Sequence, residues 1–549
     1  MTTDTSRRAL RSRRLVGGLT VGVPLLFMVV VFVYPLVNIL VTGLSSEGGA
    51  FAAFGDVLTK PSLRGVAWFT TWQAVASTVL TLVLAMPAAY VFARYDFPGR
   101  SMLRAAVTIP FVMPTLVVGA AFLALVGPNG ALGFDLSSTI WAILLAHIFY
   151  NYAVVVRTVG GLWAHLDPRL EEAARMLGAS RWKTFRSVTL PLLRPAIAAA
   201  SSIIFLFTFT SFGVILVLGN LEFRTIEIEI WRQTVGFLNL PVAAALSVLQ
   251  LVAVSLILVA YSRYQEKRSV EQSLAPAATT ARRPQGRREW TVVASVLTST
   301  AVLLGAPLVV LVERALRYSG TWSLSGFRSL ADQTDSPLFV PATEAIGNSL
   351  GFAVLTMAIA LLIGILAATV IAHRRGAVGR GFDLLLMLPL GTSAVTIGFG
   401  FLVAFDTPID LRTSPILIPL AHSLIAIPFV VRSVVPVMRA VRTRLREAAR
   451  MLGASPIRAW REIDLPLITR SGLVAAGFAF AISLGEFGAT AFLIRPDRPT
   501  LPIAIFRLLG RPGELNFGRA MALSVILMVL TAVSIMAIER FRFGDSGEF

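Results

Sequence analysis

Long apolar stretches without charges alternate with short polar segments along the whole chain. A helix needs about 20 apolar residues to cross the hydrocarbon core of a bilayer. The pattern predicts twelve such helices, and we therefore expect an all-α, polytopic membrane protein. Those of the first half lie near Leu15–Thr42, Val66–Phe92, Ala105–Val126, Ser138–Val156, Ala196–Leu218 and Leu240–Tyr261. Those of the second half lie near Trp290–Val312, Ala345–Ala372, Leu384–Ala404, Ser414–Val431, Ser471–Ile494 and Ala520–Ile538.

The composition supports this class and sets an orientation. Of the 549 residues, 56% are hydrophobic and 14% are charged. The net charge is +19, and with a cytoplasmic N-terminus the inner segments hold 36 of the 49 Lys and Arg residues. This bias favours cytoplasmic N- and C-termini in a bacterial cell membrane, with lipid rather than nucleic acid around the basic chain. The chain has no cysteine, which excludes disulfides, thiolate metal sites and cysteine nucleophiles.

The two halves are related by an internal sequence duplication. The nine residues Glu172–Ser180 recur without change at Glu447–Ser455, 275 positions later. Over Arg169–Leu192 and Arg444–Leu467, 15 of 24 positions are identical. Six predicted spans per half is an even number, so both halves enter the membrane from the same side. We expect parallel repeats about a pseudo-two-fold axis along the membrane normal.

The duplication divides the chain into two membrane domains and a connection. The first domain covers residues 1–261 and the second covers 290–549. Residues 262–289 are basic and contain Ala275-Pro276-Ala277-Ala278, which indicates a flexible cytoplasmic linker that serves connection alone.

The repeated string predicts a compact knob on the cytoplasmic face of each half. Leu170–Leu177 has good helix formers, and Gly178 or Gly453 then ends the helix. A second short helix through Trp182–Val188 would end before Leu190-Pro191. Glu172 and Glu447 suit the positive end of the first helix dipole and would pair with nearby arginines.

The motif Glu-Ala-Ala, three residues, Gly-Ala-Ser and a later Leu-Pro resembles the EAA loop of bacterial ABC importer permeases. The two loops span about residues 157–195 and 432–470. The resemblance covers nearly the whole chain and identifies it as a fused, double-domain permease of the type I importer fold. The matching positions, which it assigns to coupling with an ATPase, are Glu172, Ala173, Ala174, Gly178 and Pro191, with Glu447, Ala448, Ala449, Gly453 and Pro466.

The resemblance also implies partners and a mechanism. A homodimer of ABC ATPase subunits would bind both knobs on the cytoplasmic side, and a periplasmic or lipid-anchored solute-binding protein would deliver the solute. The bundles would rock between outward-open and inward-open states. The alternative for the loops is an amphipathic interfacial helix that only caps the bundle. It does not explain nine identical residues in halves whose flanking spans differ.

The chain has no glycine-rich phosphate loop followed by Lys-Ser/Thr. We therefore expect no enzyme activity and no cofactor on this chain, with ATP and Mg held by the partner ATPase. A secondary transporter is the rival of another class, although it needs intramembrane ionisable residues to couple ions. A membrane-embedded enzyme is a further rival, and no metal-ligand cluster or nucleophile–base pair supports it.

Glu486 is the one carboxylate within the predicted spans, and its counterpart in the first half is Ser211. A charge in hydrocarbon is costly, so Glu486 should face the interior or a water-filled path. Ser211 and Glu486 are candidates for the translocation path or its gate. The alternative for Glu486 is a structural hydrogen bond to a neighbouring helix. His147 and His422 occupy matched places, either as neutral hydrogen-bonding groups between helices or as a metal site.

The substrate is the least specified feature. Fused permeases of this size resemble importers for thiamine and for ferric iron. Leu145–Asn151, the stretch from Ser211 to Glu227, and Leu424–Phe429 are more similar to the thiamine type. The resemblance therefore favours thiamine or a related small cation, with ferric iron as the alternative.

Overall fold

The computed structural model describes residues 18–45, 48–49, 51–128, 130–268, 280–332, 337–373, 376–407, 410–440, 448–449 and 451–542. In this part of the chain the fold is all-α apart from one short hairpin, as predicted. Helices satisfy every backbone hydrogen bond internally, which suits long apolar segments in lipid.

The first half runs from a π-helical turn to a long sixth span. Its elements are η1 (Val29–Val33), α2 (Tyr34–Leu44), α3 (Ala52–Thr59), α4 (Pro61–Arg94), α5 (Arg100–Ala106), α6 (Ile109–Val112), α7 (Thr115–Val126), α8 (Ile140–His165), α9 (Pro168–Met176), α10 (Arg181–Thr184), η2 (Phe185–Thr189), α11 (Leu190–Phe209), α12 (Gly213–Leu218), α13 (Ile226–Trp231), η3 (Arg232–Gly236) and α14 (Leu240–Arg268).

The second half repeats this order and adds the hairpin after its first span. Its elements are α16 (Gly286–Ala315), β1 (Arg317–Tyr318), β2 (Thr321–Trp322), α17 (Ser325–Arg328), η4 (Ser329–Ala331), α18 (Ala342–His373), α19 (Ala377–Met387), η5 (Leu388–Gly391), α20 (Ala394–Ala404), α21 (Leu417–Ala440), α23 (Pro456–Ala459), η6 (Trp460–Asp464), α24 (Leu465–Gly485), α25 (Thr490–Leu493), α26 (Leu501–Leu509) and α27 (Glu514–Arg542). The strands pair antiparallel, with Arg317 opposite Trp322.

Ten helices in the described chain are long and apolar enough to span a membrane, and two bent pairs would bring the number to twelve. The spans predicted at Ala105–Val126 and Leu384–Ala404 are both sharply bent. Arg100–Val112 and Thr115–Val126 meet at 100°, and Gly379–Gly391 and Ala394–Ala404 meet at 99°. Pro114 lacks an N–H and forces Met113 into an extended conformation, while Ser393 caps a new helix by accepting from Thr396 N.

Each bent pair still connects the two sides of the bundle. The first pair follows the end of α4. That end lies next to the end of α8 that leads into α9, because Tyr90 of α4 contacts Trp163 of α8. The pair ends at Val126, near the opposite ends of α8 and α12, where Ser138 N donates to Leu218 O over 3.1 Å. Counting each pair as one crossing gives six crossings per half, so the two halves run parallel. We call the side that carries α9 and α23 the knob side, and the opposite side the far side.

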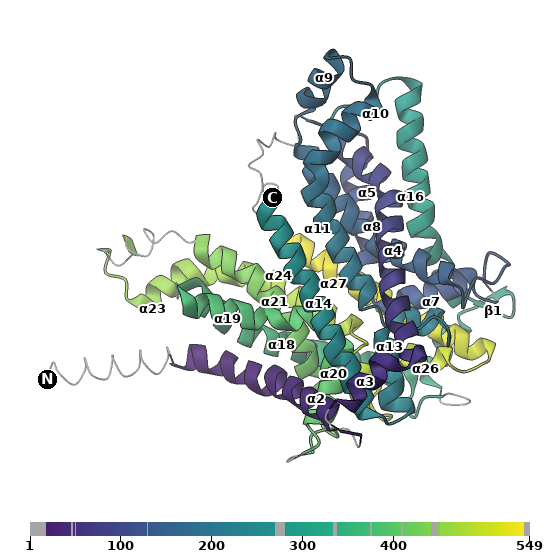
Figure 1. The fold of residues 1–549 in the computed structure, drawn as a ribbon, viewed down its shortest axis with the longest axis vertical. Coiled ribbons are helices and arrows are strands. Elements are labelled where there is room, and N and C mark those ends of the chain that lie inside the picture. Colours follow the sequence, from purple (N-terminus) through teal and green to yellow (C-terminus); the bar gives the residue numbers. More distant parts are fainter. Residues whose placement is uncertain are drawn as a thin grey trace.

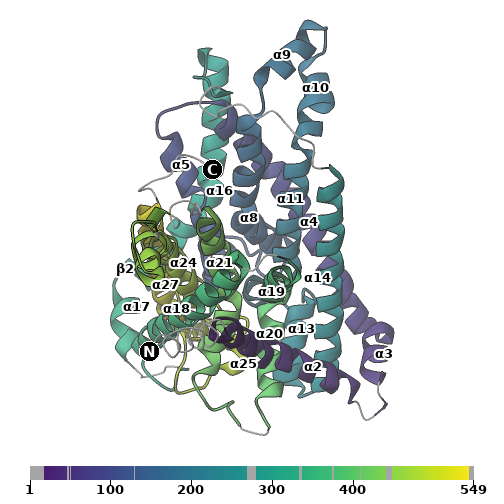
Figure 2. The same cartoon turned by 90° about the vertical axis from the view of Figure 1, so that its left-hand side faces the viewer.

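The two halves form bundles that diverge toward the knob side. In Figure 1, α4, α8, α11, α14 and α16 stand upright, and α18, α21 and α24 run toward the left. Figure 2 looks along that second direction and shows the same divergence. The tip with α9 and α10 and the tip with α23 are therefore far apart, whereas the bundles meet around α13, α20 and α26.

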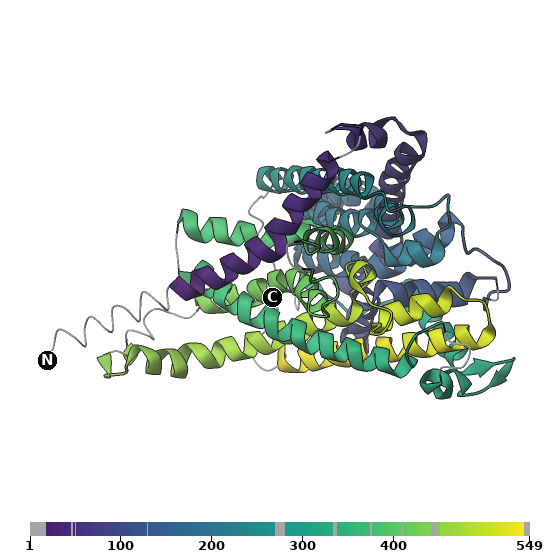
Figure 3. The same cartoon turned by 90° about the horizontal axis from the view of Figure 1, so that it is seen from below.

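The first span of each half packs on the other half. α2 lies between α14 and α20, and Tyr34 contacts Phe405 with ring centroids 6.0 Å apart. α16 packs on α7 and α4, and the Tyr152 hydroxyl lies 2.9 Å from the Thr300 hydroxyl. Seen from below, the purple helix α2 runs along the green helices of the second half (Figure 3).

The segment predicted as a linker, residues 262–289, is shorter than expected. α14 continues to Arg268 and α16 begins at Gly286. The described stretch before α16 is attached to the first half, because Arg282 N donates to Arg94 O (3.1 Å) and Asp96 N donates to Arg282 O (2.9 Å). Arg282 also forms an ion pair with Glu289 at the start of α16.

Candidate functional site

The first knob, residues 167–189, is a helix, a glycine turn and a second helix. Asp167 caps α9 by accepting from Arg169 N, and α9 ends at Met176. Gly178 has a φ of +82°, the left-handed conformation that closes a helix, and Ala179 N donates to Ala174 O (3.1 Å). Ser180 then caps α10 by accepting from Lys183 N. The predicted glycine stop is confirmed.

The second helix of the knob does not end before Leu190-Pro191, so that expectation was wrong. α10 continues through the π-helical turn η2 into α11, and the helix Arg181–Phe209 is one span. The wider π-helical turn accommodates Pro191, which has no N–H to donate. The second half has the same arrangement, with η6 before Pro466 and α24. Both prolines thus lie where the knob joins a membrane span.

The second knob, described at residues 448–449 and 451–464, repeats the backbone of the first. Gly453 also has a φ of +82°, and Ala454 N donates to Ala449 O over 2.9 Å. Leu452 N donates to Ala448 O over 3.0 Å. Glu447 lies outside the described residues. Identical residues in the two copies therefore build the same turn.

The arginine contact expected for Glu172 is made by Glu171 instead. Glu171 Oε1 lies 3.0 Å from Arg94 Nη2 and accepts from the Thr189 hydroxyl over 2.9 Å. Arg94 is buried and also donates to Leu166 O. Glu172 is exposed. Glu171 consequently fastens the knob to the end of α4, while Glu172 and Ala173 lie on the exposed side.

The tips of both knobs present large apolar side chains to the surroundings. Met176 and Leu177 are 88% and 89% exposed, and Met451 and Leu452 have the same values. Trp182 adds another exposed ring to the first knob at 68%. Apolar side chains gathered at a projecting, otherwise charged tip indicate a binding surface. The repeat places the same surface on each half.

A cluster of four aromatic rings lies where the two halves meet. Phe212 and Phe487 stack with centroids 5.3 Å apart, and Trp231 contacts Phe506 edge-on at 6.2 Å. Each pair is related by the same 275-residue offset as the knobs. The pseudo-two-fold axis therefore passes through contacts between equivalent rings. These rings lie between the two bundles where the bundles meet, away from the knobs.

Ser211 and Glu486 lie beside these rings, in breaks of the helices rather than inside straight spans. α11 ends at Phe209 before α12, and α24 ends at Gly485 before α25. The spans predicted at Ala196–Leu218 and Ser471–Ile494 are thus interrupted. Gly213 allows the first break to approach α7, since a Cβ there would lie 2.5 Å from Thr115 Oγ1.

The matched histidines are hydrogen-bonded groups that hold these breaks. His147 bonds the Ser77 hydroxyl at 3.0 Å and the Ser211 hydroxyl at 2.9 Å. His422 Nε2 lies 2.9 Å from Glu486 Oε2. The described residues contain no group of three or more His, Asp or Glu side chains placed to hold a metal. The hydrogen-bonding interpretation of the histidines is the one that the geometry supports.

Glu486 makes structural hydrogen bonds and also lies next to a cavity. Its carboxylate accepts from the amides of Ala489 (2.8 Å) and Thr490 (3.1 Å), and so caps α25. It also lines a cavity of about 210 Å³ between the halves, together with Ser211 and the buried Glu227 of α13. The sequence did not single out Glu227, because neighbouring charges made the segment resemble a far-side loop.

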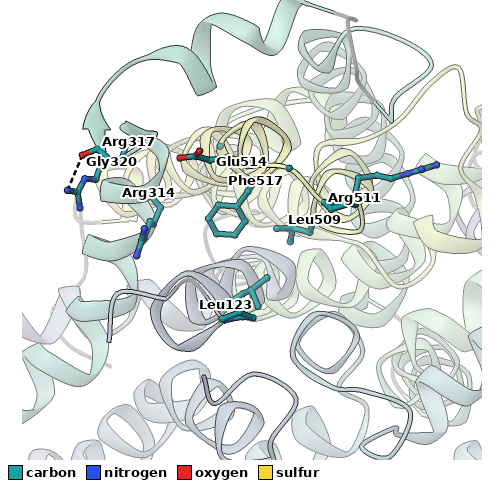
Figure 4. Close-up of a pocket in the computed structure, with 12 residues that line it drawn as sticks. Leu123, Arg314, Arg317, Gly320, Leu509, Arg511, Glu514 and Phe517 are labelled. Carbon is teal, nitrogen blue, oxygen red and sulfur yellow. Dashed lines mark hydrogen bonds between the residues drawn. The ribbon is translucent and has the colours of Figure 1, made fainter. Parts of the chain in front are cut away.

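A second cavity, of about 760 Å³, lies on the far side of the second half. Arg314, Arg317 and Arg511 line it, with Leu123 from the first half. Figure 4 shows Arg314 and Phe517 on the side of this cavity that faces Leu123. Arg314 Nε is buried without a hydrogen-bond partner among the described residues. The cavity is therefore a basic recess on the face opposite the knobs.

Comparisons with known proteins agree with this architecture. Residues 81–271 and 360–541 both match the family described as binding-protein-dependent transport system inner membrane component. A probable ABC transporter permease of Sinorhizobium fredii is 26% identical, covering 91% of each chain. A thiamine transport system permease of Brucella abortus is 28% identical, covering 91% of this chain and 92% of its own.

A sulfate transport system permease of Escherichia coli is 33% identical but matches 47% of this chain, although 96% of its own. A solved chain from a bacterial ABC transporter that imports alginate covers 48% of this chain with a TM-score of 0.41 and 14% identity. The duplicated family match, the twelve crossings and the multi-pass apolar helices describe one class of inner-membrane protein. The chain belongs to the binding-protein-dependent transport system inner membrane components and is a fused permease of an ABC importer.

Proposed function

We propose that this permease imports thiamine or a related small cation, driven by a homodimer of ABC ATPase subunits that binds both knobs. The observation that carries the proposal is the pair of equivalent apolar tips, Met176-Leu177 and Met451-Leu452. Two identical surfaces on one chain suit two identical partners. ATP and Mg would be held by the ATPase subunits, with no cofactor on the permease.

The thiamine assignment is supported by relatives that match both halves. The Brucella thiamine permease covers 91% of this chain, and an Escherichia coli thiamine permease covers 80%. The sulfate permease matches 47%, about one half. A family likeness between single halves is weaker support for a shared substrate than one across both halves, because the path lies between them.

The charge distribution supports an orientation with the knobs and both ends of the described chain in the cytoplasm. The basic far-side recess would then face the extracytoplasmic solute-binding protein. Arginine forks pair well with carboxylates, so an acidic side chain of that protein is the contact we propose for Arg314 and Arg511.

The docking role is tested by co-purification of the tagged permease with its ATPase. Met176→Asp with Leu177→Asp should weaken ATPase recovery and thiamine uptake by at least about tenfold, since two apolar side chains that the ATPase would cover are replaced by charges. Leu132→Asp with Phe134→Asp is the matched control, because these exposed residues lie in the far-side loop. Normal recovery by the knob variant would reject docking at the tips.

The substrate is tested in proteoliposomes with the receptor and the ATPase, supplied separately with labelled thiamine and Fe(III). ATP-dependent uptake of thiamine, together with failure to accumulate iron, is the expected result. The reverse pattern would reject the thiamine assignment while leaving the importer mechanism intact. Purified permease alone should show no ATP hydrolysis.

A further inference from the structure

The cavity between the halves is lined by hydrogen-bond acceptors and by rings. The side chains that line it include two carboxylates, Glu227 and Glu486, and the amide of Asn151. None of the described residues that line it is Lys or Arg. A cavity with this balance attracts a ligand that donates hydrogen bonds and carries positive charge.

Asn151 carries an unpaired acceptor in this cavity. Its side chain is 1% exposed, and its Nδ2 donates to His147 O over 3.0 Å. Its Oδ1 has no donor among the described residues. Buried acceptors are almost always paired, so this oxygen indicates a missing N–H or O–H group.

Glu227 and Glu486 differ in the groups that donate hydrogen bonds to their carboxylates. Glu486 is surrounded by donors: the ring of His422, two backbone amides and the Thr490 hydroxyl. Glu227 accepts from Gln250 of its own half and from the Ser393 hydroxyl of the other half (3.2 Å). Neither donor is cationic, and no ion pair to Glu227 occurs among the described residues. Of the two carboxylates that line the cavity, that of Glu227 is therefore the one without a cationic or backbone donor among the described residues.

The walls and the size of the cavity restrict the ligand further. Phe212 and Phe487 stack at its edge, and Tyr150 and Phe207 also line it. Aromatic faces bind flat cationic rings well. The volume, about 210 Å³, is below the roughly 300–1,000 Å³ of typical ligand pockets. It suits a single ring rather than a complete solute with substituents.

We propose that this cavity is a binding subsite for the cationic ring of the transported solute, with Glu227 as its counter-charge and Asn151 as the acceptor for a neighbouring N–H or O–H group. The proposal rests on the proposed import of a small cation and adds a specificity-determining step within the membrane domain. The solute meets the acceptors next to the Phe212–Phe487 closure, after its release from the receptor. Both halves contribute, because Ser393 and Glu486 come from the second half.

Thiamine binding to the permease–ATPase complex in nanodiscs, without the receptor, tests the subsite. Wild-type complex should show saturable binding, and Glu227→Gln and Asn151→Leu should each weaken it about tenfold or more. Gln at 227 can still accept from Gln250, so the packing is retained. Glu222→Gln is the matched control, since Glu222 is exposed and does not line the cavity. It should bind thiamine like the wild type.

Receptor-dependent uptake in the same preparations separates the two proposals. If wild-type complex imports thiamine and both cavity variants bind and import it equally well, the subsite is rejected and the proposed function stands. If wild-type complex imports no thiamine, the proposed substrate is rejected. Equal melting temperatures for the variants and wild type would show that a loss of binding is not a loss of folding.

Discussion

Two buried glutamates in this permease differ in the groups that donate hydrogen bonds to their carboxylates. Glu486 ends α24 and caps α25, so its carboxylate is committed to local structure. Glu227 lies on α13, between two spans, and its donors are neutral. Burial raises the pKa of Glu227 from 4.5 to about 8, although hydrogen bonds from Gln250 and Ser393 oppose the shift. This side chain is consequently protonated at neutral pH until a cation arrives.

Cation binding should therefore release a proton from Glu227. A bound cation favours the ionised carboxylate and lowers its pKa, so binding tightens as the pH rises toward the raised value and levels off above it. We expect the thiamine affinity of the permease–ATPase complex to increase between about pH 6.5 and about 8.5. Titration calorimetry in two buffers of different protonation enthalpy measures the released proton.

Glu227→Gln should remove this pH dependence, while Glu222→Gln should retain it. The other titratable groups on the cavity, His147, Tyr150 and Glu486, remain in both variants. A pH dependence that persists in Glu227→Gln would assign the released proton to one of them instead.

At the scale of elements, the nine identical residues of the two knobs specify the same glycine turn. Both copies have glycine at a φ of +82°, where a side chain with a Cβ is strained by roughly 1–2 kcal/mol. Asn tolerates this conformation better than a β-branched residue does. The turn sets the direction in which the Met-Leu tip leaves the first helix, and hence where the proposed ATPase partner would bind.

Gly178→Val with Gly453→Val should therefore uncouple ATP hydrolysis from uptake, reducing thiamine transport per ATP by at least about fivefold for this strain. Gly178→Asn with Gly453→Asn should restore most of the coupling. The measurement is the ratio of uptake to hydrolysis in proteoliposomes. Equal ratios in both double variants would show that the turn geometry has no part in coupling.

The hydropathy pattern predicted the number of crossings and the knobs, because apolar length and a repeated polar string are local signals. Apolar length alone could not reveal the bends of 100° and 99°, since α6, α7 and α20 are as apolar as straight spans, although Pro114 and Pro389 are local signals of a break. Of the residues that line the cavity, the sequence singled out Ser211 and Glu486 but not Glu227. Ser393 reaches Glu227 from 166 positions away, and Phe212 and Phe487 are two of 35 phenylalanines. Only the packing of the halves distinguishes them.

At the scale of the whole molecule, the two bundles touch at one end and stand apart at the other. The Phe212–Phe487 contact closes the far end, and the knobs stand apart (Figure 1). A rigid-body rotation that brings the knobs together would separate these rings. Movement of the two tips by an ATPase dimer is thus expected to open the path toward the receptor.

The absence of native cysteine makes this rotation measurable. Phe212→Cys with Phe487→Cys should be joined by a short bifunctional thiol reagent without nucleotide, and crosslinking should fall when ATP analogue and receptor are bound. Phe122→Cys with Phe149→Cys is the matched control, because those rings lie 5.5 Å apart within one half. If the extent of crosslinking between positions 212 and 487 does not change when nucleotide binds, the rotation is contradicted.

The exchange of first spans has a consequence for biosynthesis. α2 leaves the ribosome early, yet one side of it packs on α20, whose residues follow 360 positions later. At roughly 5–20 residues per second, the nascent helix waits on the order of tens of seconds with that flank against lipid. Neither half can complete its own packing while the other is missing. The packing of α2 is therefore complete only after α20 of the second half has been made.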